Sequence, residues 1–220
     1  MPEWITIDEN GATHVTLVPE TAYFNSIVTS GVADLRFTKT QGWEDLRVPL
    51  NAVKLGGSKD PTFSKVNDDG LGSQGVFAYV FSNSQEQEVY FQVQIPHSWK
   101  LEDVLYPHVH WSPADSTTGT VRWGLEYSWA NLNAVYSATT IITGDEVVSA
   151  DSTKKHLLTE IGSGIDGSAI SGVSSMLDCR LFRDVSVSGN LAAGVALKEF
   201  DFHYEIDTVG SYSQYVKYPT

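Results

Sequence analysis

Hydrophobic and polar residues alternate with a period of two over most of the chain, and this pattern predicts β-strands. No window of about twelve residues shows a clear 3.6-residue period, so we expect almost no helix. Turn-forming Gly, Ser, Thr, Asn and Asp recur about every ten residues, which is typical of an all-β sandwich. The expected strands are His14–Val18, Gly75–Phe81, Glu88–Ile95, Val104–Trp111, Val121–Trp129, Ala138–Ile142, Lys155–Ile161, Ser175–Arg183 and Lys198–Asp207.

The clearest division into two faces lies between residues 104 and 129, which read as two strands around a polar turn. In the first strand, His108 and His110 point one way, and Val109 and Trp111 point the other. The apolar face of the second strand comprises Val121, Trp123, Leu125, Tyr127 and Trp129. Because a short Ser-Pro-Ala-Asp-Ser-Thr-Thr-Gly turn joins the strands, we expect them to form one hairpin.

The number of strands suits an eight-stranded jelly roll with additional strands. We therefore expect an all-β protein whose antiparallel β-sandwich, of jelly-roll type, covers residues 71–220. Residues 1–70 show little alternation and only spaced apolar residues, so they predict an extended N-terminal arm. Such an arm would lie on its own domain or on a neighbouring subunit. The arm residues expected to make these contacts are Trp43, Leu46, Arg47, Val48 and Leu50.

Composition narrows the classes of function. The 220 residues include 27 acidic and 14 scattered basic ones, a net charge of −13, which argues against nucleic-acid binding. No apolar run is long enough for a membrane-spanning helix, so no membrane partner is expected. The acidic start MPEWITIDENG lacks the apolar core of a secretory signal. The single cysteine, Cys179, excludes an intrachain disulfide and is expected to be a buried small hydrophobe.

His108 and His110 are the strongest candidates for site chemistry, because histidines two residues apart on a strand project side by side, as a metal-ligand pair requires. The arrangement resembles the cupin family, a jelly roll that uses a His-x-His, then an acid, then a later histidine. Asp115 and His203 would take the last two places here. The glycine that should precede the His-x-His is missing, however, and turn chemistry already explains Asp115.

The alternative interpretation places His108 and His110 on the polar or partner-facing side of the sandwich. In that case we expect hydrogen bonds to neighbours such as Arg122 or Glu126, and neither a bound metal nor another cofactor.

The last expected strand has the most regular alternation in the chain. Its polar face comprises Glu199, Asp201, His203, Glu205 and Asp207. Four carboxylates on one face repel one another unless they are solvated, paired with bases or bound to metal. Solvation is the simplest reading, and a contact with Arg122, Arg180 or Arg183 of another subunit is the next.

Other motifs have simple structural explanations. G-x-G-x-x-G occurs from Gly70 and from Gly162, but no helix is expected after either, so both are interpreted as loops. Trp4, Trp43 and Trp99 lie outside the regular strands and are candidates for contact with a partner or a glycan.

Several segments are informative as a set: LRVPLNAVKLGGSKDPTF, GVFAYVF, VQIPHSWK, YPHVHWSP, VRWGLEYSWAN, SSMLDCRLFRD and EFDFHYEIDTVGSYSQYVK. Together they resemble a group of tailed-bacteriophage virion structural proteins over about residues 43–217. The resemblance carries no catalytic motif. It implies a β-rich, jelly-roll component of a phage particle and leaves its place in the particle open.

We accordingly expect a non-enzymatic capsid decoration (cement) protein that assembles in the bacterial host cytoplasm and resides in the virion. Its expected partners are further copies of itself, as a homotrimer by analogy, and the major capsid protein or other virion proteins. One alternative is a tail, head-fibre or baseplate component that contacts the host surface or glycans. The other is a cupin-like metal-binding protein using His108, His110 and His203.

Overall fold

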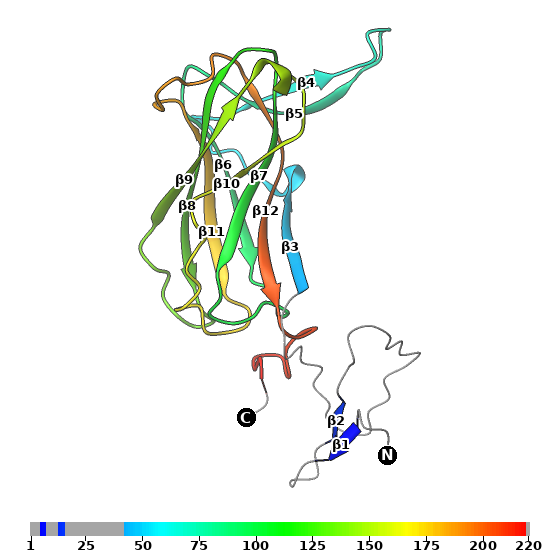
Figure 1. Ribbon diagram of the computed structural model, residues 1–220. Helices are drawn as coiled ribbons and strands as arrows, with labels where there is room; N and C mark the ends of the chain where they lie inside the picture. The colour runs from blue at the N-terminus through cyan, green and yellow to red at the C-terminus, as the bar shows by residue number, and fades with distance from the viewer. Residues whose placement is uncertain (1–4, 8–12, 16–41, 219–220) are drawn as a thin grey trace. The chain divides into compact units, whose positions relative to one another are not determined.

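The computed structural model describes residues 5–7, 13–15 and 42–218 (Figure 1). The chain divides into two units, residues 1–34 and residues 35–220. In the first unit, β1 and β2 pair antiparallel to each other. The second unit contains the remaining described strands and the candidate site.

Strands dominate the described residues, as the alternation predicts. The strands are β1 (Ile5–Ile7), β2 (Thr13–Val15), β3 (Gly42–Pro49), β4 (Thr62–Asn67), β5 (Val76–Phe81), β6 (Gln87–Gln94), β7 (Leu105–Pro113), β8 (Gly119–Ala130), β9 (Thr140–Val148), β10 (Leu157–Glu160), β11 (Met176–Asp184) and β12 (Val195–Ile206). Two short 3-10 helices are η1 (Leu50–Ala52) and η2 (Ala150–Ser152). Among the described residues, no helix is long and apolar enough to span a membrane.

The second unit is an antiparallel β-sandwich, which confirms the predicted fold class (Figure 1). The first sheet has the order β10-β7-β12-β5-β4, with β3 also paired to β12. The second sheet has the order β6-β11-β8-β9. Strands β5 to β12 pass between the two sheets in the order of an eight-stranded jelly roll, and β3 and β4 are additions to it.

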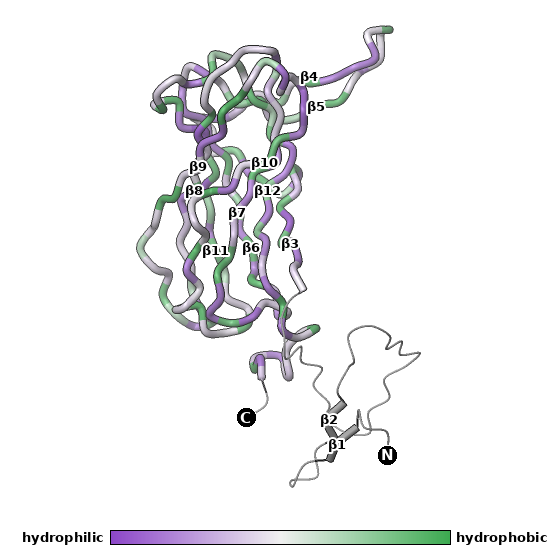
Figure 2. Tube along the Cα trace, in the orientation of Figure 1, coloured by the Kyte–Doolittle hydropathy of each residue, from purple (hydrophilic) through white to green (hydrophobic). Residues whose placement is uncertain are grey.

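The core lies between the sheets and is built from large aromatic side chains. The ring centroids of Trp111 and Trp123 lie 6.2 Å apart, and Phe81 packs edge-on against Trp123 at 5.1 Å. Phe91 from the second sheet lies 4.9 Å from Phe200 of the first sheet. Burying each phenylalanine contributes about 2–3 kcal/mol. Hydrophilic and hydrophobic positions alternate along the strands that enclose this core (Figure 2).

The hairpin expected between residues 104 and 129 is wrong. β7 pairs with β10 and β12 in the first sheet, whereas β8 pairs with β11 and β9 in the second sheet. The turn between β7 and β8 therefore carries the chain from one sheet to the other. Alternation identifies a strand and its buried face, but it does not identify the neighbouring strand. Trp111 and Trp123 do both face the core, from opposite sides.

The expected arm does not extend to residue 70. β3 pairs with the second half of β12, and β4 pairs with β5, so both strands belong to the first sheet. Each is an exposed edge strand that buries few side chains, which explains its weak alternation. Within the expected arm, residues 1–41 lie outside the described residues except for β1 and β2.

A β-bulge at Lys198 determines which side chains of β12 face outward. The register between β12 and β7 shifts directly after Leu197, which leaves Lys198 as the extra residue. Leu197 is buried before the bulge and Phe200 is buried after it. Asp201 and His203 consequently point away from the core. The bulge lies where the neighbour of β12 changes from β5 to β3.

Strand β11 carries two unusual core residues. Cys179 is 5% exposed, opposite Phe91 and Tyr127 of the flanking strands, and its burial raises the pKa of the thiol. It is thus the buried small hydrophobe that the sequence predicts. Arg183 is completely buried, and its guanidinium donates hydrogen bonds to backbone carbonyls rather than to a carboxylate of the described residues.

Candidate functional site

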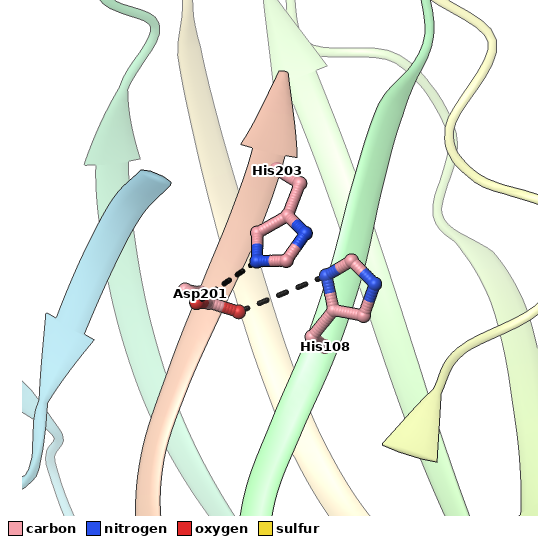
Figure 3. Close-up of side chains that lie close together, drawn as sticks. All are labelled: His108, Asp201 and His203. Atoms are coloured by element: carbon pink, nitrogen blue, oxygen red, sulfur yellow. Dashed lines mark ion pairs between the residues drawn. The ribbon is translucent and has the colours of Figure 1, made fainter. Parts of the chain in front are cut away.

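The candidate site lies on the outer face of the first sheet, where β7 and β12 are neighbours (Figure 3). Because β7 buries Val109 and Trp111, it presents His108 and His110 on its outer face. The Cα of Asp201 on β12 is directly opposite that of His108. The bulge therefore brings a carboxylate beside the His-x-His pair.

Asp201 is the centre of the site and is 4% exposed. Its Oδ1 lies 3.8 Å from His108 Nδ1, and its Oδ2 lies 3.5 Å from His203 Nε2. Figure 3 shows both imidazoles directed toward this carboxylate from the two strands. The His108 and His203 rings are close to each other as well, with centroids 3.9 Å apart.

Two buried atoms of the site lack hydrogen bonds. Asp201 Oδ1 and His108 Nδ1 have no hydrogen-bond partner among the described residues. They face each other, but a separation of 3.8 Å is too long for a hydrogen bond. A buried polar atom left unpaired costs about 1–3 kcal/mol. A group that binds between these two atoms would therefore stabilise the site.

His110 supports the carboxylate from one side. Its Nε2 lies 3.2 Å from Asp201 Oδ2, and its Nδ1 lies 2.7 Å from His156 Nε2. Within each contact between two imidazoles, one nitrogen donates and the other accepts. His110 thus links Asp201 to the exposed ring of His156.

Two further carboxylates border the site. Glu160 Oε1 on β10 lies 3.9 Å from His108 Nε2, and Asp45 Oδ1 on β3 lies 3.2 Å from His203 Nε2. Burial lowers the pKa of His108, and the neighbouring His203 lowers it further, whereas Asp201 and Glu160 oppose the change. His108 is therefore a neutral imidazole near pH 7, with a lone pair available on one ring nitrogen.

The set of donors defines the chemistry available here. His108, Asp201 and His203 offer two imidazole nitrogens and a carboxylate oxygen, and these atoms lie within 4.8 Å of one another. Zinc and similar transition-metal ions accept such ligands in proteins.

The structure brings together the three histidines predicted as ligands, His108, His110 and His203, although His203 is far from the others in sequence. Asp115 is not part of this cluster, and its carboxylate accepts a hydrogen bond from the backbone N–H of Thr117 within its own turn. The acid at the cluster is Asp201 instead. The sequence placed Asp201 on the same strand face as His203, but nothing in its local pattern linked it to His108.

The expected hydrogen bonds from His108 or His110 to Arg122 or Glu126 are wrong. Arg122 and Glu126 lie on β8 in the second sheet, where Arg122 pairs with Asp145 and Glu126 pairs with Arg180. The error follows from the predicted hairpin of β7 and β8, because the two strands lie in different sheets.

The acidic face of β12 is largely neutralised within the chain. The ion pairs are Glu199 with Arg47, Glu205 with Lys100 and Asp207 with Lys217. Arg122, Arg180 and Arg183 take no part in them. Asp201 differs from the other three acids because histidines alone pair with it among the described residues.

The residues predicted to contact a partner fall on β3 and η1. Val48 is buried in the core, and Leu46 and Leu50 pack against it, so these three side chains contact their own domain. Arg47 is engaged in its ion pair with β12. Trp43 is 54% exposed and is the predicted apolar residue most accessible to a partner.

The other tryptophan and glycine motifs also have clear positions. Trp99 is completely buried and cannot contact a glycan, and Trp4 lies outside the described residues. Gly70 and Gly162 have φ angles of 69° and 66° in turns, as expected of loop glycines.

Comparison with known proteins identifies no family. No protein-family model matches the sequence, and no curated protein does. Three solved structures resemble the chain at the level of a β-sandwich. A Clostridium thermocellum xylanase 10B structure (CBM22-1 and GH10 modules with xylohexaose) has a TM-score of 0.39 at 13% identity, over 76% of this chain and 28% of that one.

The second structure, TmCBM61 with β-1,4-galactotriose, has a TM-score of 0.31 at 12% identity, over 74% of this chain and 88% of that one. The third, infectious bursal disease virus strain Gx, has a TM-score of 0.28 at 11% identity, over 94% of this chain and 68% of that one. With TM-scores below 0.5, these likenesses carry no argument about this chain.

Proposed function

We propose that this chain is a non-enzymatic structural protein of a tailed-phage particle. Its role would be capsid decoration, in which homotrimers bind the major capsid protein and stabilise the head. The sequence resemblance supplies the phage setting. The observation that carries the proposal is an uncovered apolar surface on the β4–β5 hairpin.

This hairpin extends beyond the sandwich (Figure 1). It exposes large apolar side chains. Phe63 is 59% exposed and Phe77 is 46% exposed, and their rings stack with centroids 5.6 Å apart. Phe63 also contacts Tyr79, at 5.3 Å. Leu71 in the loop and Val76 at the start of β5 are still more exposed.

The exposed phenylalanines continue the core-facing side of the sheet. Phe77, Tyr79 and Phe81 are two residues apart and so lie on the same face of β5. Phe81 is completely buried between the sheets. Over the hairpin, Phe63 and Phe77 stay exposed, so no strand among the described residues covers this face. Because contiguous exposed apolar surface marks interaction sites, we infer that a neighbouring copy of the chain covers the hairpin.

The number of copies in the purified virion tests the proposal. We expect quantitative mass spectrometry to find on the order of hundreds of copies per particle, as repeated capsid positions require. Purified protein should also bind expanded capsids that lack it, through many weak contacts that add by multivalency. About a dozen copies or fewer, together with no capsid binding, would contradict decoration and indicate a tail position.

A second candidate function is a tail, head-fibre or baseplate component that contacts host glycans. It is favoured by the exposed pair of Trp43 and Tyr106 on the outer face of the first sheet, whose ring centroids lie 5.7 Å apart. Exposed aromatic rings can stack on sugars. A glycan array would support this alternative if binding depended on Trp43 and was lost in Trp43→Ala.

A further inference from the structure

We propose that His108, Asp201 and His203 bind one divalent transition-metal ion, such as zinc, on the outer face of the first sheet. This proposal is independent of the particle to which the chain belongs. It differs from the cupin pattern, because the carboxylate comes from the same strand as the last histidine, as Asp-x-His on β12.

The separations between the donor atoms suit a shared ion. With metal–ligand distances of about 2.1 Å, two ligands of one tetrahedral ion lie roughly 3.4 Å apart. Asp201 Oδ1 lies 3.8 Å from His108 Nδ1, and Asp201 Oδ2 lies 3.5 Å from His203 Nε2. All three donor atoms lie within 4.8 Å of one another, and His203 is one-third exposed and able to adjust.

Burial shows that the site is built for a ligand. The side chains of His108 and Asp201 are 6% and 5% exposed, and each presents an unpaired polar atom toward the other. A cation held between them would satisfy both atoms at once. It would also balance the charge of Asp201, which has no lysine or arginine in an ion pair among the described residues, unlike Glu199 and Glu205.

The type of ligand selects the type of ion. Two imidazole nitrogens favour zinc and its neighbours in the transition series over magnesium or calcium, which prefer oxygen ligands. Asp45 and Glu160 add negative charge at the border of the site. A divalent cation is therefore favoured electrostatically as well.

His110 has a supporting role in this arrangement. Its hydrogen bond to Asp201 Oδ2 fixes the orientation of the carboxylate, as outer-shell partners do in metal sites. We expect His110→Ala to weaken zinc binding about 10- to 100-fold without abolishing it.

The test uses the purified full chain, stripped with a chelator and titrated with zinc alone by calorimetry, with metal content measured after gel filtration. We expect one zinc per chain and a raised Tm, because zinc stabilises the folded state to which it binds. Cobalt should give the visible absorption of a site with nitrogen and oxygen ligands. Asp201→Asn and His203→Gln should weaken zinc binding more than about 100-fold, exceeding the effect of an outer-shell change.

His156→Gln is the matched control, because it removes an exposed histidine that is bonded to His110 rather than to Asp201, and it should weaken zinc binding less than His110→Ala does. All variants are compared by circular dichroism in chelator. If the variant His108→Ala does not fold because its site is buried, the partly exposed His203 still provides the test. The proposal is overturned if no stoichiometric zinc binds, if His203→Gln binds zinc as tightly as the native chain, or if only His156→Gln loses binding, which would assign zinc to the His110–His156 pair.

Discussion

At the scale of single residues, Arg183 shows how a guanidinium can be buried in the core without an ion pair to a carboxylate of the described residues. Its guanidinium donates to the backbone carbonyls of Phe81, Leu191 and Ala193, at 3.2, 2.7 and 2.8 Å. Burial lowers the pKa of Arg183 to about 10. The side chain thereby ties β11 to the end of β5 and to the loop before β12.

Replacing Arg183 with leucine should destabilise the fold by about 2–4 kcal/mol, because three buried carbonyls lose their donor. Arg183→Lys should cause a similar or smaller loss, since one ammonium cannot reach the same acceptors in the same geometry. Urea denaturation followed by tryptophan fluorescence measures both effects. A leucine variant as stable as the native protein would show that these carbonyls do not need the guanidinium.

Arg180 organises a second charged cluster, on the outer face of the second sheet. It lies 2.7 Å from Glu88 and 2.8 Å from Glu126. Burial of Glu88 raises the pKa of its carboxyl, but hydrogen bonds from Tyr90 and Arg180 outweigh that effect and hold the pKa below its ordinary value. Folding is therefore favoured by the ionised form of Glu88.

This shift predicts a loss of stability in acid. Because the pKa of Glu88 is lower in the folded state, its contribution is fully present above the unfolded pKa of about 4.3 and is lost as pH falls through the folded value. Arg180→Gln should reduce stability by about 2 kcal/mol at pH 7 and flatten the acid dependence. Urea titrations at several pH values between neutral and strongly acidic test this. Equal pH dependence in the two proteins would refute the assignment to Arg180.

At the scale of elements, periodicity predicted most strands well but not their neighbours. The alternation around Trp111 and Trp123 located β7 and β8 and their buried faces. It could not separate a hairpin from a crossing between sheets, because both leave the same alternation. The exposed edge strands β3 and β4 have little to bury, so they lacked the signal that identified the central strands.

The candidate site was predictable only in part, for the same physical reason. The sequence identified His108, His110 and His203 by residue type and face. Placing Asp201 opposite His108 required the pairing of β7 with β12 and the shift in register at Lys198. Neither follows from local pattern, since partners distant in sequence are selected by packing of the whole sandwich.

At the scale of the whole molecule, the net charge of −13 opposes close approach of copies. Any self-association must therefore rest on apolar contact or on matched charges. The uncovered face of the β4–β5 hairpin supplies the apolar contact. Raising the salt concentration weakens repulsion between exposed charges, so it should strengthen association of this kind.

Replacing Phe63 and Phe77 together with serine should convert the proposed trimer to monomers, because the exposed aromatic surface is lost while the sandwich core is untouched. Analytical ultracentrifugation across a concentration series measures the change, and the Tm of the monomer controls for folding. The matched control is Ile141→Ser, which removes an exposed apolar side chain on β9, an edge strand of the second sheet. Trimers that persist in the double variant would exclude the hairpin as the contact.

The single cysteine has a practical consequence. Cys179 lies in the middle of β11, which pairs on both sides with β6 and β8, and the residue is only 5% exposed. Because Cys179 belongs to the core between the two sheets, a thiol-labelling reagent reacts with it readily only when the sandwich opens locally. The labelling rate under native conditions therefore reports the frequency of these opening events, and from it the local free energy of opening. The same labelling reaction needs no engineered probe. Its rate then shows whether zinc, salt or subunit contact makes local opening of the sandwich less frequent.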